Sequence, residues 1–354
     1  MKILIAVGIS GEEYEVGGFL VEQLKALGHE VCTAGPVYGR TDISHSHPLK
    51  ADIDLPDKPH PETYTYKEVL DKAPWTPDFV LQIEAHFYFV GDKPKGVKSY
   101  YWVHDPHRGG VGHRDMAMRG TFDAVFITHM FFAKPYLIKG IKCFLLPFAF
   151  SPERIKHDPS MQPECDISFP GQTGIHPDDI VYGKIDGDGF EYCSMLPDNI
   201  RFLSQYGEYW ERAMLLRHLM KHFDVRLYKR YPAPAYARIL QKGKIGFHRS
   251  TNNIPPRLFQ NMACRRATAA DYVLGIEEML TDGEHVSLYD QFQYNPSLSN
   301  FLLDCEQAEL CVYKLLNKHD MRKEIAEKGY EHVHKHHTYR NRADRIIERA
   351  EGGV

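Results

Sequence analysis

Short apolar runs alternate with amphipathic stretches along the first part of the chain. Residues 3–7 are apolar, residues 19–27 repeat apolar positions at helical spacing, and residues 29–34 (HEVCTA) again have a strand-like pattern. This order predicts a strand, a helix and a second strand, and a unit of this kind implies a parallel sheet with helices on both faces. Residues 35–61 are rich in Pro, His and Asp, which indicates a long loop. The further strands expected in this half are residues 79–83, 99–103, 124–127 and 143–146.

A second α/β pattern begins near residue 166. Residues 175–207 are rich in Asp, Gly and Pro and have little periodicity, so we expect an insertion there. We therefore predict a mixed α/β protein with two doubly wound, Rossmann-like domains that face a cleft, over residues 1–160 and 161–335. A closing C-terminal helix is expected over 336–354. The elements expected in the second domain are strands at 166–169, 225–228 and 245–248 and helices at 212–223, 236–241, 256–263, 306–316 and 320–337.

Bulk properties narrow the class of protein. The chain has 354 residues, which fits two ordinary domains, and 43% hydrophobic with 25% charged residues is a globular composition. No apolar run approaches the roughly 18 residues that a membrane span needs, so we expect no stable span. Seven cysteines without a CxxC pair predict reduced thiols and a cytoplasmic protein.

Positive charge is concentrated in the middle of the chain. Residues 209–266 hold thirteen Lys or Arg and only two acids, Glu211 and Asp224, although the whole chain has a net charge of −4. These basic residues lie beside glycines, prolines and turns. Such a concentration favours binding of an anion, with phosphate as the first candidate, over a solvated basic face.

Residues 245–283 carry the densest set of candidate binding groups. A predicted strand ends at His248 and Arg249, a polar loop follows, and a helix begins with proline in its first turn. Backbone N–H groups and the dipole of such a helix favour a diphosphate, and Arg249 or Arg257 can pair with it. Farther on, Glu277 and Glu278 lie at a turn, where they can accept hydrogen bonds from sugar or ribose hydroxyls.

Several short sequence blocks between residues 248 and 340 occur in the order typical of one enzyme group. With them, the chain resembles the donor-binding half of the GT-B glycosyltransferases, and specifically the CgeB-like (spore maturation protein type) group. The resemblance spans roughly residues 166–345. Two positions depart from the group: Gln260 stands where a ribose-binding Glu is typical, and Arg265-Arg266 replaces a glycine after Cys264. The matching blocks are His248–Arg249, Asn253–Pro255, Arg257–Gln260, Ala263–Cys264, Gly275–Met279, Asp282–Gly283, Gly329–Tyr330 and His337–Arg340.

The resemblance implies a GT-B fold and transfer of a sugar, of the hexosyltransferase type, from a nucleotide-diphosphate sugar to an acceptor hydroxyl. It also implies no cofactor and no metal, because basic groups and helix dipoles hold the diphosphate. The first phosphate-facing loop would include Gly171 and Gln172. From the residues and the resemblance together, the expected donor-binding residues are Gly171, Gln172, Lys229, His248, Arg249, Asn253, Arg257, Gln260, Gly275, Glu277 and Glu278.

Residues 102–107 follow a predicted strand and are expected to face the cleft. Transfer with inversion needs a base for the acceptor proton, and Asp105 is the candidate, followed by His104. Glu84 and His86 are secondary candidates. In a retaining enzyme the donor phosphate itself could assist, so both stereochemical outcomes stay open.

Two other functions fit the sequence. A nucleic-acid-modifying glycosyltransferase of the phage DNA type keeps the fold, and its basic segment would track a phosphate backbone. A catalytically silent nucleotide-sugar-binding protein fits the departures at Gln260 and Arg265. The acceptor stays open among glycan, small molecule, protein and nucleic acid. His332 and His336 share a helix face, but structural use is favoured over metal binding there.

Overall fold

The chain divides into two compact units, the first formed by Met1–Ala149 with Thr338–Val354 and the second by Phe150–His337. The predicted domain limits were residues 160 and 335. No helix in the described part of the chain is both long and apolar enough to cross a membrane. The computed structural model describes residues 1–7, 11–35, 51–56, 62–83, 87–103, 119–171, 173, 175, 179–197, 210–229, 231, 233–249, 254–273, 275–289 and 298–352.

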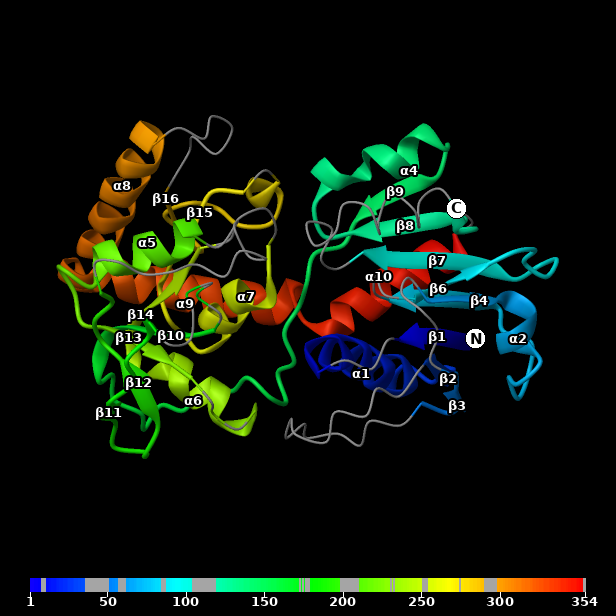
Figure 1. The fold of residues 1–354 in the computed structure, drawn as a ribbon, viewed down its shortest axis with the longest axis horizontal. Helices are drawn as coiled ribbons and strands as arrows, with labels where there is room; N and C mark the ends of the chain where they lie inside the picture. The colour runs from blue at the N-terminus through cyan, green and yellow to red at the C-terminus, as the bar shows by residue number, and fades with distance from the viewer. Residues whose placement is uncertain are drawn as a thin grey trace. The chain divides into compact units, whose positions relative to one another are not determined.

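A parallel seven-stranded sheet forms the centre of the first unit, with the order β3-β2-β1-β5-β7-β8-β9 (Figure 1). The chain runs from β1 outward to β3 and then crosses to β5, as in a doubly wound sheet. Ile3 pairs with Val31 on one side and with Phe79 on the other. Strand β3 falls within the stretch that was expected to be a loop. The strands are β1 Lys2–Val7, β2 Glu30–Gly35, β3 Ile53–Asp54, β5 Phe79–Ile83, β7 Lys98–Val103, β8 Ala124–Ile127 and β9 Lys142–Leu145.

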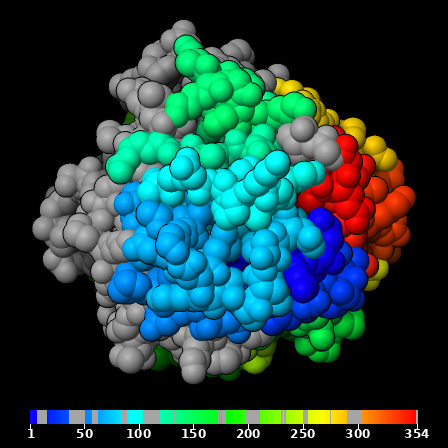
Figure 2. Space-filling model, turned by 90° about the vertical axis from the view of Figure 1, so that its right-hand side faces the viewer, coloured from blue at the N-terminus to red at the C-terminus, as the bar shows by residue number. Residues whose placement is uncertain are grey.

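The last helix, α10 (Tyr339–Glu351), completes the core of this first unit. The ring of Tyr339 packs 5.3 Å from that of Phe19 in α1. Arg342 is only 1% exposed, and its guanidinium donates to the carbonyls of Pro147 and Phe148, each at 2.7 Å. In Figure 2 the C-terminal segment (red) lies beside the N-terminal residues (blue). The other elements of this unit are α1 Gly11–Ala26, β4 Glu62–Thr65, α2 Tyr66–Leu70, β6 Phe87–Val90, η1 Met130–Ala133 and α4 Lys134–Ile138.

The sheet of the second unit has the order β11-β12-β13-β10-β14-β15-β16. Its five parallel strands follow the doubly wound order in which the first strand lies between the second and the third. The direction of winding therefore reverses between β10 and β14, and this place is called the reversal point below. Strands β11 and β12 form an antiparallel hairpin at the edge, inside the predicted insertion. The strands are β10 Cys165–Pro170, β11 Lys184–Ile185, β12 Glu191–Cys193, β13 Val225–Tyr228, β14 Gly243–His248, β15 Thr268–Asp271 and β16 Ser287–Tyr289.

Helices cover both faces of this second sheet. One core cluster joins α5 and α8 to the side chains of Ile167 and Ile245, and another joins α6, α7 and α9 to Ala270. The predicted limits of α6 and α7 are those observed, because turn residues and proline mark both helices in the sequence. The helices are α5 Trp210–Leu219, η4 Ala233–Ala235, α6 Tyr236–Gln241, α7 Pro256–Ala263, η5 Ile276–Glu278, α8 Leu298–Asn317 and α9 His319–His336.

Candidate functional site

The carboxyl ends of β10 and β14 flank the reversal point of the second sheet, where doubly wound proteins bind ligands. Gly171 follows β10, and Arg257 lies in the first turn of α7, which follows β14. A Cβ atom built on Gly171 would lie 2.0 Å from Nη2 of Arg257, and the φ of Gly171 is +152°. Glycine is therefore required for the guanidinium to lie this close to the backbone. Two residues that the sequence predicted for the donor site meet here.

Among the described residues, an aromatic ring and no carboxylate contacts the Arg257 guanidinium. Its Cζ atom lies 4.5 Å from the ring centroid of Phe169 in β10. The Nε atom of Arg257 is buried and has no hydrogen-bond partner among the residues that the structure describes. A cation–π contact fixes the side chain but leaves the planar donors of the guanidinium available to an anion.

His248 ends β14 and is 2% exposed. Neither ring nitrogen has a hydrogen-bond partner in the described part of the chain, and Nε2 lies 3.8 Å from Oδ1 of Asp271. Burial, followed by the charges of Arg257, Arg212 and Arg249, holds the pKa of His248 well below its usual range. Burial and the neighbouring positive charges thus both disfavour a charged imidazole at the end of β14.

Arg249 follows His248 and is 3% exposed. Its Nη2 donates to Oε2 of Glu211 at 2.8 Å, and its carbonyl accepts from Nε of Arg212 at 3.0 Å. Both partners belong to α5. The Arg249 charge is thus already matched by a carboxylate, which leaves Arg257 as the better candidate for an incoming anion.

Two other predicted residues lie near the same sheet edge. Lys229 follows β13, where its Nζ is 3.3 Å from Oε2 of Glu191 and 4.0 Å from the ring centroid of Tyr182. Gln260 is partly buried and lies three residues after Arg257 on α7, so the two side chains share a helix face.

The predicted hydroxyl-binding turn lies at η5. Gly275 is the N-cap of this short helix, and its backbone N–H donates to Oε2 of Glu277 at 3.1 Å. Glu277 and Glu278 are both exposed. Glu277 therefore caps its own turn, whereas Glu278 is exposed to solvent.

Several predicted residues lie outside the described part of the chain. These include two donor-site residues and all the candidates for the acceptor base. The residues concerned are Gln172, Asn253, Asp105, His104, Glu84 and His86.

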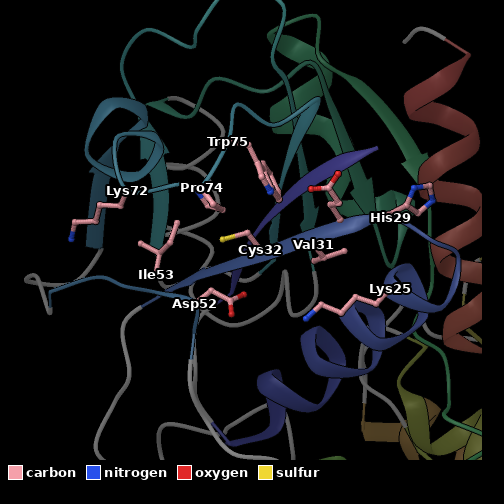
Figure 3. Close-up of a pocket in the computed structure, with 10 residues that line it drawn as sticks. Lys25, His29, Val31, Cys32, Asp52, Ile53, Lys72, Pro74 and Trp75 are labelled. Atoms are coloured by element: carbon pink, nitrogen blue, oxygen red, sulfur yellow. The ribbon is translucent and has the colours of Figure 1, made fainter.

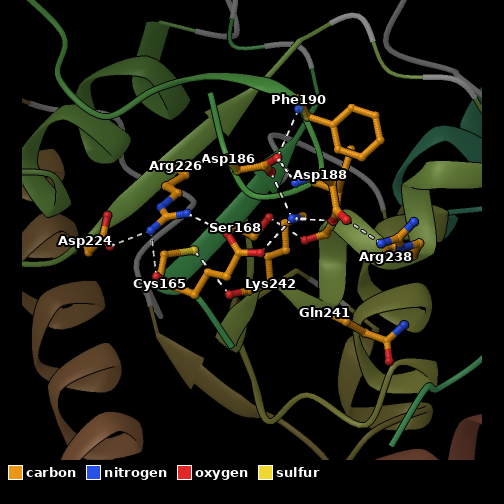
Figure 4. Close-up of polar contacts among 12 residues, drawn as sticks. Cys165, Ser168, Asp186, Asp188, Phe190, Asp224, Arg226, Arg238, Gln241 and Lys242 are labelled. Carbon is orange, nitrogen blue, oxygen red and sulfur yellow. Dashed lines mark hydrogen bonds and ion pairs between the residues drawn. The ribbon is translucent and has the colours of Figure 1, made fainter. Parts of the chain in front are cut away.

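Most of the positive charge in residues 209–266 is neutralised internally. Figure 4 shows the fully buried Lys242, whose Nζ lies 2.7 Å from Oε1 of Glu164, 3.0 Å from Oδ2 of Asp186 and 2.6 Å from Oδ2 of Asp188. Burial lowers the pKa of Lys242, but its hydrogen bonds to the three carboxylates outweigh burial and raise it. Carboxylate partners are also observed for Arg226, Lys229, Arg238, Lys244, Arg249 and Arg265.

Arg265 and Arg266, one of the two departures from the resembled group, both contact other parts of the second unit. Arg265 donates to Glu327 at 2.5 Å and stacks on the ring of Tyr330, both in α9. Arg266 donates to the carbonyl of Gln241 at 2.6 Å. Neither contact involves a predicted donor-site residue, so this departure leaves the candidate site intact.

The predictions missed Glu211 and Phe169, which fix the two arginines of the site. Glu211 is one of only two acids in the basic segment, and that contrast could have singled it out. Phe169 carries no such signal, because an aromatic residue inside a buried strand is normally a core residue. At the C-terminus, His332 Nε2 lies 2.7 Å from the carbonyl oxygen of Met279, in keeping with the structural use that was favoured for it.

A hollow of about 640 Å³ occurs in the first unit (Figure 3). It lies at the start of β2, near Lys25, His29, Cys32 and Trp75. Ligands of doubly wound sheets bind at the carboxyl ends of the strands, whereas this hollow lies at an amino end. We therefore do not place the functional site there.

Comparison with known structures defines the fold as GT-B. Sucrose-phosphate synthase from Thermosynechococcus elongatus is similar, with a TM-score of 0.62 and 13% identity over 99% of this chain and 98% of that one. HepE of Anabaena in complex with UDP-glucose has a TM-score of 0.59 and 13% identity over both full chains. An α-glucosyltransferase bound to UDP and a 13-mer DNA has a TM-score of 0.57 and 10% identity over 99% of this chain and 100% of that one.

A comparison with protein-family models matches part of the chain. Residues 196–348 match the model of the glycosyl transferase-like family. The matched segment includes Arg249, Arg257 and the turn at Gly275. The chain has no significant match among curated proteins. The CgeB-like group stays a prediction from the sequence motifs.

Proposed function

We propose that this protein is a glycosyltransferase that moves a sugar from a nucleotide-diphosphate sugar to an acceptor hydroxyl. The observation that carries the proposal is the contact between Gly171 and the Arg257 guanidinium at the reversal point of the second sheet. The guanidinium is fixed by Phe169, and no carboxylate partner neutralises it among the described residues. The match of residues 196–348 to the glycosyl transferase-like family supports the same function.

In the proposed reaction, Arg257 pairs with the diphosphate and stabilises the negative charge that develops on the leaving group. The bond between the anomeric carbon and the diphosphate oxygen breaks, and a bond to the acceptor oxygen forms. If the enzyme inverts, the acceptor proton goes to Asp105 or His104. If it retains, the proton goes to the departing phosphate. Glu278 would accept hydrogen bonds from donor hydroxyls.

We propose further that the reaction requires no metal and takes place in the cytoplasm. Arginine supplies the charge that a divalent ion provides to diphosphates in other enzymes. All seven cysteines are free thiols, in keeping with a reducing compartment. The nucleobase and sugar of the donor stay open. UDP is the first nucleotide to test because complexes of two structurally similar proteins contain UDP or UDP-glucose.

A DNA-modifying role is less well supported than transfer to other acceptors. At least seven of the thirteen cations in residues 209–266 have carboxylate partners, so the segment offers a phosphate backbone far less charge than its sequence indicates. A silent nucleotide-sugar-binding protein is the remaining alternative, and detectable turnover of any donor sugar excludes it.

Calorimetric titration with UDP, GDP, TDP and ADP tests the donor site, with and without EDTA. We expect one nucleotide to bind with the same affinity in the presence and absence of EDTA. The Arg257→Ala variant should bind this nucleotide about 100-fold more weakly, because a charge-assisted pair is lost. Lys244→Ala is the matched control, since it removes one positive charge from the opposite end of β14 and should leave binding unchanged.

Two results would contradict the proposal. Equal affinities of the Arg257→Ala variant and the native protein would place the diphosphate elsewhere. A folded native protein that binds none of the four nucleotides would remove the proposed donor site, and DNA and RNA should then be tested as ligands.

A further inference from the structure

Two histidines lie on one face of α5 and the turn that follows it. His218 is near the end of the helix, and His222 comes four residues later. The backbone N–H of Phe223 still bonds to the carbonyl of Leu219 at 2.9 Å, so the helical course continues through this turn. The two imidazole rings are consequently neighbours, with centroids 5.2 Å apart.

A carboxylate from α8 approaches both rings. Oε2 of Glu309 lies 2.7 Å from Nε2 of His218 and 3.7 Å from Nε2 of His222. The ligand atoms of the three residues all lie within 4.8 Å of one another. Their side chains are 27%, 44% and 33% exposed for His218, His222 and Glu309, so an ion can reach them from solvent.

These distances suit a small transition-metal ion. Zinc binds imidazole nitrogen and carboxylate oxygen at about 2.0–2.2 Å, which places neighbouring ligand atoms of a tetrahedral site about 3.4 Å apart. The two observed separations lie on either side of that value, and rotations of partly exposed side chains can close the difference. Three protein ligands leave a fourth position for water.

We propose that His218, His222 and Glu309 bind a transition-metal dication, with zinc as the best match. Two imidazoles with one carboxylate favour zinc, cobalt, nickel or copper over magnesium or calcium, which prefer oxygen ligands alone. The bound ion links α5 to α8, whose apolar side chains Leu216 and Ala308 already belong to one core cluster.

The proposed ion is separate from the proposed sugar transfer. His218 lies seven residues after Glu211 on α5, which corresponds to about 10 Å along the helix axis. Glu211 pairs with Arg249 near the candidate donor site. The ion therefore steadies the helix that supports the site and makes no contact with the predicted donor residues.

Zinc titration of the full-length protein tests this site. The protein is first stripped with EDTA and the chelator removed, and zinc is then titrated against a chromophoric chelator of known affinity. We expect one zinc per chain, a higher melting temperature with zinc, and tetrahedral-type visible absorption when cobalt replaces it. His222→Ala and Glu309→Gln should each weaken this binding about tenfold or more. Glu309→Gln keeps a hydrogen-bond acceptor for His218, and circular dichroism in metal-free buffer verifies that both variants fold.

His319→Ala is the control, because His319 is an exposed histidine of the same unit at the start of α9. It should bind zinc like the native protein. Unchanged affinity and stoichiometry in both His222→Ala and Glu309→Gln would overturn the proposal, as would the absence of zinc binding by the native protein. If His319→Ala lost as much zinc affinity as the other two variants, the ion would belong to another site, and the proposal would again be overturned. Nucleotide binding in EDTA is measured separately, so failure of one proposal leaves the other intact.

Discussion

At the scale of single residues, the candidate donor site depends on a close approach between one glycine and one arginine. The Arg257 guanidinium occupies the space that a side chain at residue 171 would fill. The guanidinium Cζ also lies 4.5 Å from the ring centroid of Phe169. The position of the charge is thus set by close approach to a backbone glycine and by stacking on a ring, a combination that suits the planar guanidinium better than a lysine ammonium.

Gly171→Ala is expected to weaken nucleotide binding more than it weakens the fold. The new methyl group displaces the flexible end of Arg257, and the backbone strain at φ +152° costs about 1 kcal/mol. We expect a loss of affinity of about tenfold or more for the nucleotide bound by the native protein, because the charge moves off the anion. Calorimetry measures the affinity and urea unfolding the stability. Native affinity in a folded Gly171→Ala protein would contradict this geometry.

Arg265 is the single described non-glycine residue with a positive φ, at +56°. It directly follows the C-cap of α7, a position where helices favour glycine. The contacts with Glu327 and Tyr330 offset part of the cost of this backbone conformation.

A comparison of Arg265→Gly with Arg265→Ala isolates that cost. Both variants lose the same side-chain contacts, but only glycine adopts a positive φ without strain. We expect the glycine variant to be more stable than the alanine variant by about 1 kcal/mol in urea unfolding. Equal stabilities would show that the backbone at residue 265 carries no strain.

At the scale of elements, one lysine attaches the β11–β12 hairpin to the sheet. Lys242 precedes β14, while Asp186 and Asp188 lie in the turn of the hairpin (Figure 4). Hydrogen bonds from Lys242 and from the backbone of Phe190 and Asp188 outweigh burial and lower the pKa of Asp186. Part of the predicted insertion is therefore held to the sheet by a buried ionic cluster.

Lys242→Met should destabilise the second unit because it leaves carboxylates grouped without their cation. Loss of one partner from a buried ionic network costs about 3–5 kcal/mol, and the partial exposure of Glu164 and Asp188 reduces this to about 2–3 kcal/mol. Urea unfolding at neutral pH measures the loss, which should shrink as acid protonates the carboxylates. Lys244→Met is the control, since Lys244 is half exposed and its ion pair contributes at most about 1 kcal/mol. If Lys242→Met and Lys244→Met lowered the free energy of unfolding by similar amounts, Lys242 would not be the cation that stabilises the buried cluster.

At the scale of the whole molecule, one buried histidine and four partly buried ones make stability depend on pH. Burial is the largest cause that lowers the pKa of His29 in the first unit and of four histidines in the second. The four in the second unit are His157, His248, His285 and His332.

A depressed pKa in the folded state means that the unfolded chain binds protons first as pH falls. The stabilising effect of neutral histidine is fully present above the ordinary pKa of 6.5 and is lost as pH falls from there toward the folded pKa values. We expect a lower free energy of unfolding at pH 5.5 than at pH 8, measured with urea in EDTA. The double variant His285→Gln with His332→Gln should show a smaller decrease. An identical decrease would mean that these two histidines do not contribute.

Local patterns in the sequence determine much of the fold by themselves. Mainly apolar runs predicted the limits of β5, β8 and β13, because parallel strands that are covered on both faces carry few polar residues. Proline and periodic apolar positions predicted α6 and α7. The sequence also singled out Gly171 and Arg257 as candidates, because they follow a strand and begin a helix, and the structure places them side by side.

Only the tertiary structure decided which of these residues act together. The sequence shows thirteen cations in one segment, but it does not show that Lys242 faces Asp186 and Asp188 from a hairpin, or that Arg249 faces Glu211. It likewise does not show that α10 returns to the first unit or that Glu309 reaches His218 from another helix. Secondary structure follows from short-range backbone preference and burial, whereas charge pairing and ligand sites depend on contacts between residues far apart in the chain.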